Sequence, residues 1–390
     1  MQSLQKLKTI IALTLAGMAL AAGYHAFIGA GEPAGYQYGT FLFSPHDRYN
    51  DFINEHKYSK DPYGKIKFTN AHFPFLKQAV RLLARADAET GLFVLLMLFA
   101  AAMLGYAAFS LKRFPLPWRI AGIITLGILN YPVLFAFDRA HLEIIVFSAL
   151  VLSVGLLNAR RYAASAAALA IAMALNPLPA IFLLLFVKRR QYRCALLALA
   201  LAAALTAGSY ALLPGGFARN WHNHRLCLDA YCQQYVTGPI GLLCRHSLFG
   251  AVRTVLRAFS PDFLRNHTAL VLNSYLLAVM AIFGAAMLGF FKYARQVWME
   301  LAILVCCMTL LPYLSADYRL LYFFIPLFYY INTDPPDPLD DVFCMLFALI
   351  LVPKAYINQF TSVMLSPLII GLLLVFVLQA ARQQALHNAN

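Results

Sequence analysis

The segment HDRYNDFINEHKYSKDPYGK, residues 46–65, holds the side chains whose types are best suited to chemistry. It places Asp47 and Asp51 beside long apolar stretches of the chain. A carboxylate in such a place can accept a proton from a hydroxyl group. The same acids also fit helix N-caps, because His-Asp-Arg and Asn-Asp-Phe are ordinary N-terminal signals. Both interpretations remain open from these residues alone.

A second set of polar residues consists of cations that adjoin apolar sequence and lie outside solvated charge runs. Its members are Arg139, Arg245, His246 and Arg319. A charge at membrane depth is costly, so it is functional by default or paired with an opposite charge.

Pairing is available to two of these cations. Arg139 has Asp138 and Glu143 nearby, and Arg319 has Asp317. No acid lies within several residues of Arg245 and His246. These two residues are therefore the better candidates for binding a phosphate.

The composition requires these side chains to be positioned by helices in a membrane. Of 390 residues, 61% are hydrophobic and only 12% are charged, and the mean hydropathy is +0.67. These values lie outside the range of soluble globular domains. We predict an all-α, polytopic integral membrane protein that forms a single membrane domain over residues 1–390, with about 10–12 transmembrane or re-entrant helices.

A spanning helix needs about 20 apolar residues, and the sequence contains long and short candidates. The long windows are 8–29, 91–111, 194–213, 269–291 and 361–380. The shorter or interrupted windows are 120–136, 142–157, 297–313, 319–332 and 342–357. The shorter windows can span if they tilt or if the bilayer thins locally.

Basic residues in the short loops predict the orientation. Lys6 and Lys8, Arg160 and Arg161, and the cluster KRRQYR at 188–193 all fall on one side if the spans alternate. That side is expected to be the cytoplasm, with both termini there. Residues 30–90 then form a first outer loop and residues 214–268 a second, outside a cytoplasmic (inner) membrane.

Residues 163–187, AASAAALAIAMALNPLPAIFLLLFV, have cytoplasmic-type charges at both ends and Asn-Pro-Leu-Pro in the middle. Each arm has about 12 residues, too few for an ordinary span. We predict a re-entrant helical hairpin broken at the prolines. A single kinked span is the alternative.

Each outer loop is predicted to contain an amphipathic helix at the membrane interface. In FLKQAVRLLAR, residues 75–85, the basic positions share one stripe and the aliphatic positions face away from it. SLFGAVRTVLRAF, residues 247–259, repeats this pattern with Arg253 and Arg257 on the charged face. Two such helices would wall a cavity at the depth of the lipid headgroups.

Several classes of partner are disfavoured. The net charge of +14 comes mostly from loop ends, so we expect membrane lipids and no nucleic acid as partners. No DxD motif and no soluble α/β domain is present, which argues against a nucleotide-sugar site; we expect no cofactor and no metal, although scattered residues could build one. Cys227, Cys232 and Cys244 share the second outer loop, where a disulfide is possible.

The order of motifs along the chain resembles family 87 glycosyltransferases of the GT-C superfamily. The first outer loop contains Asp51-Phe52, Asp61-Pro62-Tyr63 and HFPF at 72–75. Further similarity lies, in order, in YPVLFAFDRAHLE at 131–143, the proline-broken segment ending in KRRQYR at 188–193, RHSLFG at 245–250 and SADYRLLYFFIPL at 315–327.

This resemblance implies transfer of a sugar from a polyprenyl-phosphate donor to a lipid-linked or cell-envelope glycan acceptor on the outer face, with inversion at the anomeric carbon. The reaction needs a carboxylate to take the proton of the acceptor hydroxyl, and cations to stabilise the departing phosphate. We expect Asp51 to be the base, with Asp47 second, because the donor sugar lies just above its lipid tail.

The remaining roles follow from the same topology. The donor phosphate is expected to bind Arg245, His246, Arg319 and Arg139, and Tyr63, His72, Asp138 and Glu143 are expected to line the acceptor side or the cavity. Aromatic belts and loop packing offer another explanation for Tyr63 and His72.

Two other function classes remain as alternatives. One is a secondary transporter with a midplane site at Asn176-Pro177 and Glu143 as a coupling carboxylate. The other is a non-catalytic subunit of an envelope glycan assembly system.

Overall fold

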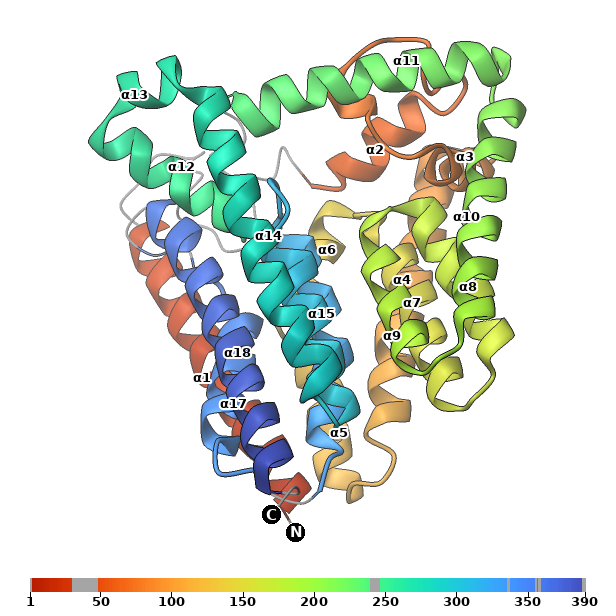
Figure 1. Cartoon of the computed structure of the whole chain (residues 1–390). Helices are drawn as coiled ribbons and strands as arrows, with labels where there is room; N and C mark the ends of the chain where they lie inside the picture. The colour runs from red at the N-terminus through yellow and green to blue at the C-terminus, as the bar shows by residue number, and fades with distance from the viewer. Residues whose placement is uncertain are drawn as a thin grey trace. The chain divides into compact units, whose positions relative to one another are not determined.

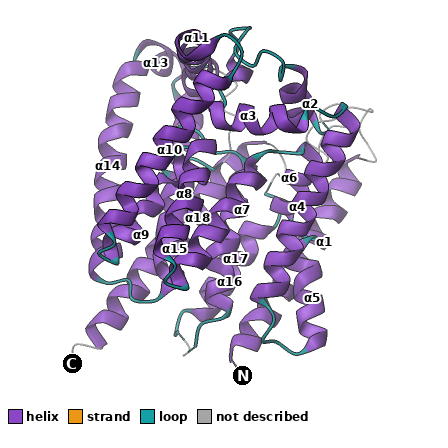
Figure 2. Ribbon diagram, turned by 90° about the vertical axis from the view of Figure 1, so that its right-hand side faces the viewer, coloured by secondary structure: helices purple, strands orange, loops and turns teal. Residues whose placement is uncertain are grey.

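The computed structural model of the chain describes residues 2–29, 48–238, 246–334, 337–354, 356 and 359–387. In these ranges the chain forms helices joined by loops, with no β-strand (Figure 2). The prediction of an all-α polytopic membrane protein is confirmed.

The helices that are long and apolar enough to span a bilayer are Gln2–Phe27, Ala88–Ser110, Tyr192–Leu212, Thr268–Lys292 and Val363–His387. They coincide with the long windows predicted from the sequence. Leu116–Gly127 and Tyr131–Arg139 together form one further candidate, bent by 49° at the break between them. Shorter apolar helices are Glu143–Asn158, Tyr162–Leu175, Leu178–Lys188 and Val297–Leu310.

The described chain divides into two compact units, and each is considered by itself. The first unit comprises residues 1–45, 103–135 and 239–390, and the second comprises residues 46–102 and 136–238. Two helices contribute residues to both units: α4 (Ala88–Ser110) and α6 (Tyr131–Arg139). Helix α4 begins at a side-chain cap, because the Asp87 carboxylate accepts hydrogen bonds from the backbone N–H and the hydroxyl of Thr90.

The first unit is a bundle of long apolar helices (Figure 1). Its elements are α1 (Gln2–Gly29), α5 (Leu116–Gly127), α12 (Leu248–Phe259), α13 (Pro261–Asn266), α14 (Thr268–Lys292), α15 (Val297–Leu310), the 3₁₀ helix η6 (Asp317–Phe323), α16 (Phe324–Ile331), α17 (Asp340–Leu351) and α18 (Gln359–His387). Helix α15 is buried from Trp298 to Leu310 and packs against α14, α16 and α18. A helix that is apolar on every face and buried forms the centre of such a bundle.

Polar contacts join helix ends at one end of the first unit. The Lys6 ammonium lies 2.9 Å from the Asp340 carboxylate at the start of α17. The Gln384 amide near the end of α18 donates to the Asp337 carboxylate at 2.8 Å. The beginning of α1 and the end of α18 therefore meet at the same short segment, residues 337–340.

The second unit combines shorter membrane-type helices with an outer layer. Its elements are α2 (Asn50–Lys57), the 3₁₀ helix η2 (Phe68–Asn70), α3 (Pro74–Leu83), α7 (Glu143–Asn158), α8 (Tyr162–Leu175), the 3₁₀ helix η3 (Leu178–Phe182), α9 (Leu183–Lys188), α10 (Tyr192–Leu212), α11 (Gly216–Tyr231) and the π-helix η4 (Cys232–Thr237). Helix α8 packs between α7 and α10. The hydroxyl groups of Ser153 and Ser165 bond across the α7–α8 contact.

The outer layer of the second unit is built from both predicted outer loops. Helix α3 packs on α8 and α10, α2 packs on α3, and η2 packs on α11. Helix α11 lies crosswise to α10 (Figure 1). Side chains from α2, η2 and α11 are thereby held close to one another.

The segment predicted as a hairpin breaks at its proline motif. Helix α8 ends at Leu175, Asn176 adopts an extended conformation, and the chain continues through η3 and α9. Proline cannot donate the hydrogen bond that a continuous helix would need. Whether the segment enters and leaves the membrane on one side remains a prediction.

The two amphipathic helices bury more of their charged stripe than the sequence pattern suggested. In α3, Lys77 is buried together with the apolar residues Leu76 and Val80. In α12, Arg253 is buried, while Phe259 is 86% exposed on the apolar face. Packing against neighbouring elements, which periodicity cannot show, decides these orientations.

Candidate functional site

Helix α2 presents two stripes of different character. Phe52 and Glu55 are buried, and Phe52 contributes the apolar anchor. Asp51 and Asn54 lie on another stripe and are only half-buried, because residues three apart share one side of a helix. The Asp51 side chain is 40% exposed. The carboxylate of Asp51 is consequently within reach of a substrate.

The nearest ionisable neighbour of Asp51 for which a distance is known is His141, in the turn between α6 and α7. Its Nε2 lies 4.0 Å from Asp51 Oδ2, which is ion-pair range but longer than a hydrogen bond. The Glu143 backbone N–H donates to His141 Nδ1 at 3.0 Å. Because Nδ1 accepts, a neutral ring carries its hydrogen on Nε2, facing Asp51.

The proline break of the second unit supports this turn. The Asn176 side-chain amide donates to both Glu143 carboxylate oxygens, at 3.2 and 3.3 Å. The Asn176 Oδ1 accepts from the Leu178 N–H. A series of contacts therefore runs from Asn176 through Glu143 to His141 and then to Asp51.

Two residues beside the site have left-handed backbone conformations. Tyr49 precedes α2 with φ 56°, and Ala140 precedes His141 with φ 48°. The Tyr49 N–H donates to the Asp138 carbonyl at 2.7 Å, and the Arg48 guanidinium lies 3.5 Å from the Asp138 carboxylate. Residues with a Cβ rarely adopt this conformation unless the surroundings impose it.

The second carboxylate of α2 has a different environment. Glu55 is 5% exposed and accepts two bonds from the buried Lys77 ammonium, at 2.8 and 2.7 Å. His72 Nε2 lies 3.7 Å from the same carboxylate, and the His72 side chain is 40% exposed. Glu55 therefore fixes α2 to α3, and its charge is already compensated.

Tyr63 lies in a small core beneath this layer. It is fully buried with Tyr210, Leu213 and Cys227, and its hydroxyl donates to the His72 carbonyl at 2.6 Å. Burial raises the pKa of the Tyr63 hydroxyl. The structure thus gives Tyr63 a packing role.

His224 of α11 reaches into the same core. Its Nε2 lies 3.2 Å from the Ala71 carbonyl, and its Nδ1 bonds to the Tyr210 hydroxyl. Burial lowers the pKa of His224 to about 4. The neutral imidazole joins α10 and α11 to the first outer loop.

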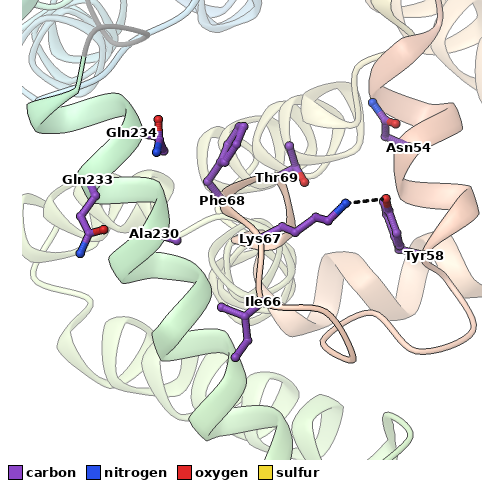
Figure 3. Close-up of a pocket in the computed structure, with 9 residues that line it drawn as sticks. All are labelled: Asn54, Tyr58, Ile66, Lys67, Phe68, Thr69, Ala230, Gln233 and Gln234. Carbon is purple, nitrogen blue, oxygen red and sulfur yellow. Dashed lines mark hydrogen bonds between the residues drawn. The ribbon is translucent and has the colours of Figure 1, made fainter.

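A pocket of about 490 Å³ opens between α2, η2 and the end of α11 (Figure 3). Residues that line it include Asn54, Tyr58, Lys67, Phe68, Thr69 and Gln234. The Lys67 ammonium extends toward Tyr58 and donates to its hydroxyl at 3.3 Å. The pocket combines aromatic rings, amides and one cation.

A separate polar cluster lies in the first unit around Asp317, at the start of η6. Its Oδ1 accepts from the Tyr131 hydroxyl at 2.7 Å and lies 3.1 Å from His246 Nε2. The Asp317 side chain is 10% exposed and that of His246 1%. Because Nε2 faces Asp317, any donation from this ring to a phosphate must come from Nδ1.

Two further cations belong to the same unit. Arg319 Nη1 donates to the Leu314 carbonyl in the turn before η6. Lys354 is buried, donates to the Val352 carbonyl at 2.9 Å, and lies 5.9 Å from the centre of the Tyr131 ring. This lysine was missed by the sequence analysis because it lies within a predicted span.

The residues predicted from the sequence fall into three groups. Asp51, Asp138, Arg139, Glu143, Tyr63 and His72 belong to the second unit, with Arg139 half-buried at the end of α6. His246 and Arg319 belong to the first unit. Asp47 and Arg245 lie outside the described residues.

Sequence reasoning missed His141 and undervalued Asn176. His141 stands in the motif DRAHLE, three residues from an acid on one side and two from an acid on the other, a density of polar groups that is unusual between apolar helices. Cys227 and Cys232 are free thiols, and Cys244 lies outside the described residues. Over the described parts of the chain, no group of three or more His, Cys, Asp or Glu residues could hold a metal ion.

The fold is that of a polytopic helical membrane protein, and each of its two units carries polar clusters on short connecting segments. A family model described as glycosyltransferase family 87 matches residues 68–315. This range covers more than half of the sequence, and the chain belongs to glycosyltransferase family 87. It is a membrane glycosyltransferase that uses a sugar donor and a glycan acceptor.

The matched range includes His141, Glu143 and His246, and it begins after Asp51. A comparison with curated proteins gave no match. The role of Asp51 must therefore be inferred from its own surroundings.

Proposed function

We propose that this enzyme transfers a sugar from a polyprenyl-phosphate donor to a lipid-linked or cell-envelope glycan on the outer face of the cytoplasmic membrane, with inversion. Asp51 is the general base of this reaction. The observation that carries the proposal is the half-exposed Asp51 carboxylate, oriented toward the Nε2 of His141.

The reaction is a single displacement at the anomeric carbon. The acceptor oxygen bonds to this carbon while the bond from the carbon to the phosphate oxygen breaks. The acceptor proton passes to Asp51, and the polyprenyl phosphate departs with the bonding electrons. A base within hydrogen-bond reach of the hydroxyl contributes about 10²- to 10⁴-fold to such a step.

His141 is a positioning residue for this base. Its ring is fixed by the Glu143 backbone N–H, and Glu143 is held by Asn176. An imidazole held beside a carboxylate favours one orientation of that carboxylate. Glu143 and Asn176 are proposed to support the site without contacting the sugar.

The cations proposed for the departing phosphate are Arg139, Arg245, His246 and Arg319. Fixed positive charges and N–H donors stabilise an oxyanion most when they are in place before the reaction. The bond that His246 Nε2 donates to the Asp317 carboxylate supports this role, because it fixes the imidazole ring.

Contacts within each unit support the proposed orientation. The two predicted outer loops pack on each other, as in the 2.9 Å bond from the Asn223 amide to the Tyr63 carbonyl. The helix ends that carry Lys6 and Gln384 meet at residues 337–340. Both sets of contacts agree with loops 30–90 and 214–268 on one side and both termini on the other.

The test is transfer of a labelled sugar from a synthetic polyprenyl-phosphate donor by the purified full-length protein. Asp51→Asn is expected to lower kcat by about 10³-fold, because the amide cannot accept the proton. Asp61→Asn is the matched control, since Asp61 belongs to the same loop but pairs with Arg219 at 2.9 Å. Full activity in Asp51→Asn would refute the assignment, and loss in Asp47→Asn alone would move the base to that residue.

The same preparation separates this proposal from transport. The carboxylate that a transporter would use, Glu143, is 6% exposed and bonded to Asn176. Accumulation of the lipid-linked sugar inside sealed vesicles, with no glycosidic product, would favour a transporter.

A further inference from the structure

The pocket between α2, η2 and the end of α11 has the chemistry of a carbohydrate subsite. Tyr58 and Phe68 supply aromatic surface, and Asn54 and Gln234 supply amides that can both donate and accept. Sugar rings combine apolar C–H faces with hydroxyl groups, so this mixture complements them. Phe68 is itself supported by Tyr235, whose ring packs edge-on at 5.6 Å.

The backbone on the α11 side is unusual. Helix α11 ends at Tyr231, and the chain continues as the π-helix η4, which carries Gln233 and Gln234. π-helical turns are rare and occur frequently at functional sites. The wider turn brings two consecutive amide side chains to the rim of one pocket.

The charged side chain in the lining of the pocket is the cation Lys67. None of the described residues that line it is acidic. Lys67 projects across it (Figure 3), and the hydrogen bond from Lys67, together with the charges of Lys57 and Lys65, lowers the pKa of the Tyr58 hydroxyl. Asp61, six residues before Lys67, is paired with Arg219.

The pocket adjoins the proposed base on one helix. Asn54 lies one turn after Asp51 on α2, a rise of about 4.5 Å, and Tyr58 lies about one turn further. Asp51 and Asn54 share a half-buried stripe of α2 next to the buried Phe52 and Glu55, and Tyr58 follows at the C-cap of the helix. A glycan held in the pocket therefore lies beside Asp51.

We propose that this pocket binds a sugar unit of the acceptor and prefers a unit that carries a negative charge. Lys67 is the specificity-determining residue, and the aromatic and amide side chains recognise the ring. This inference deepens the proposed function, because it gives the acceptor of the Asp51 reaction its subsite. The anionic group can be a sugar carboxylate or a sugar phosphate, which share the chemistry of an ammonium partner.

The test measures binding to the full-length protein in lipid nanodiscs, without donor. The probes are a short oligoglucuronate, the neutral oligoglucose of the same length, and that oligoglucose with one phosphate monoester. We expect both anionic probes, or one of them, to bind about tenfold more tightly than the neutral probe. The anionic probe that binds more tightly, the carboxylate or the phosphate, identifies the source of the charge.

Lys67→Gln is expected to remove this preference and to leave binding of the neutral probe unchanged. Lys60→Gln removes the same charge from the same exposed segment but outside the pocket, and should leave the preference intact. Both positions are exposed, so unfolding is not expected, and a melting curve for each variant checks this. Equal behaviour of the two variants would overturn the proposal, as would equal binding of all probes or no binding of any.

A further measurement separates this inference from the assignment of Asp51. Asp51→Asn should bind the anionic probe as tightly as the unchanged protein while losing transfer. If Asp51→Asn binds the probe and is fully active in transfer, Asp51 is not the base, and the proposed subsite is still supported. Displacement of the probe by polyprenyl phosphate would show that the pocket holds the donor, and would overturn the acceptor subsite.

Discussion

Asp317 and Asp51 each have a histidine neighbour, and their surroundings differ. Asp317, in the first unit, is 10% exposed and accepts from Tyr131 at 2.7 Å and from His246 at 3.1 Å. Asp51, in the second unit, is 40% exposed and lies 4.0 Å from His141. The first carboxylate is buried and accepts two hydrogen bonds, whereas the second is exposed enough for a substrate to reach it.

A buried acid next to a histidine, such as Asp317 beside His246, is therefore not by itself a catalytic pair. Asp317 fixes its histidine, and a proton accepted there would weaken two bonds. At Asp51 the contact is longer, 4.0 Å, and it is the histidine that the protein holds, because the Glu143 backbone N–H donates to His141 Nδ1. Exposure and the strength of existing bonds distinguish a general base from a structural carboxylate.

The largest expected effect concerns Asp317, the carboxylate with a structural role. Asp317→Ala leaves the Tyr131 hydroxyl and the His246 N–H without their acceptor in a buried place. We expect the free energy of unfolding to fall by about 4 kcal/mol, since each unsatisfied buried group costs about 1–3 kcal/mol. Thermal or denaturant unfolding in detergent measures this change.

Asp317→Asn is the matched variant, because its amide oxygen can still accept one of these bonds. It should lose clearly less stability than Asp317→Ala. Equal stability of Asp317→Ala and the unchanged protein would contradict a structural role.

A second effect concerns a buried histidine that is bonded to a hydroxyl and a carbonyl. The folded-state pKa of His224 is about 4, below its ordinary value of 6.5. Below pH 6.5 the unfolded chain binds a proton that the folded chain does not, so stability is complete above 6.5 and is lost as the pH falls toward 4. This histidine contributes up to about 3 kcal/mol to that loss.

Unfolding curves at several pH values below 7 test this expectation. His224→Gln should flatten the pH dependence in this window. His222→Gln, on the exposed face of the same helix, should leave it unchanged. An unchanged slope in His224→Gln would refute the assignment.

The smallest expected effect concerns His141, the neighbour of the proposed base Asp51. His141→Ala should lower kcat by about tenfold and leave the KM for both substrates unchanged, because His141 orients Asp51 without binding the sugar. The measurement is steady-state kinetics of transfer. Partial recovery in His141→Gln, which keeps an N–H donor, would distinguish positioning from a loss of packing.

A rise in KM with unchanged kcat would show that His141 contacts a substrate. Loss of folding in His141→Ala but not in His141→Gln would indicate packing alone.

Much of the fold could be predicted from the sequence, because the long spans depend on a local property. About 20 apolar residues in a row have few other solutions, and the long predicted windows correspond to the long helices of the structure. The shorter helices were harder, since their ends depend on turns such as the one between Gly127 and Tyr131. The division into two units left no signal in the sequence.

The candidate site could be predicted only in part. Asp51 and Glu143 could be proposed from the sequence because acids are scarce in the chain. Lys77 was expected on a charged stripe, but the partner that buries it, Glu55, is 22 residues away. Such pairs are tertiary, and no period in either segment encodes them.

The pocket was not predictable at all. Its walls come from α2, from the segment at 66–69 and from residues 230–234, and their meeting depends on the π-helical turn. That turn has no strong sequence signature, although Gln233 and Gln234 are adjacent amides in an aromatic neighbourhood.

The left-handed alanine at position 140 has a further consequence. An alanine with φ 48° carries roughly 1 kcal/mol of backbone strain that glycine would not have. Replacing Ala140 by glycine would raise the thermal stability of the enzyme. It would also loosen the backbone that positions the neighbouring His141 ring. Thermal stability and catalytic rate are thus opposed at one backbone torsion angle. A substitution there that raises one should lower the other.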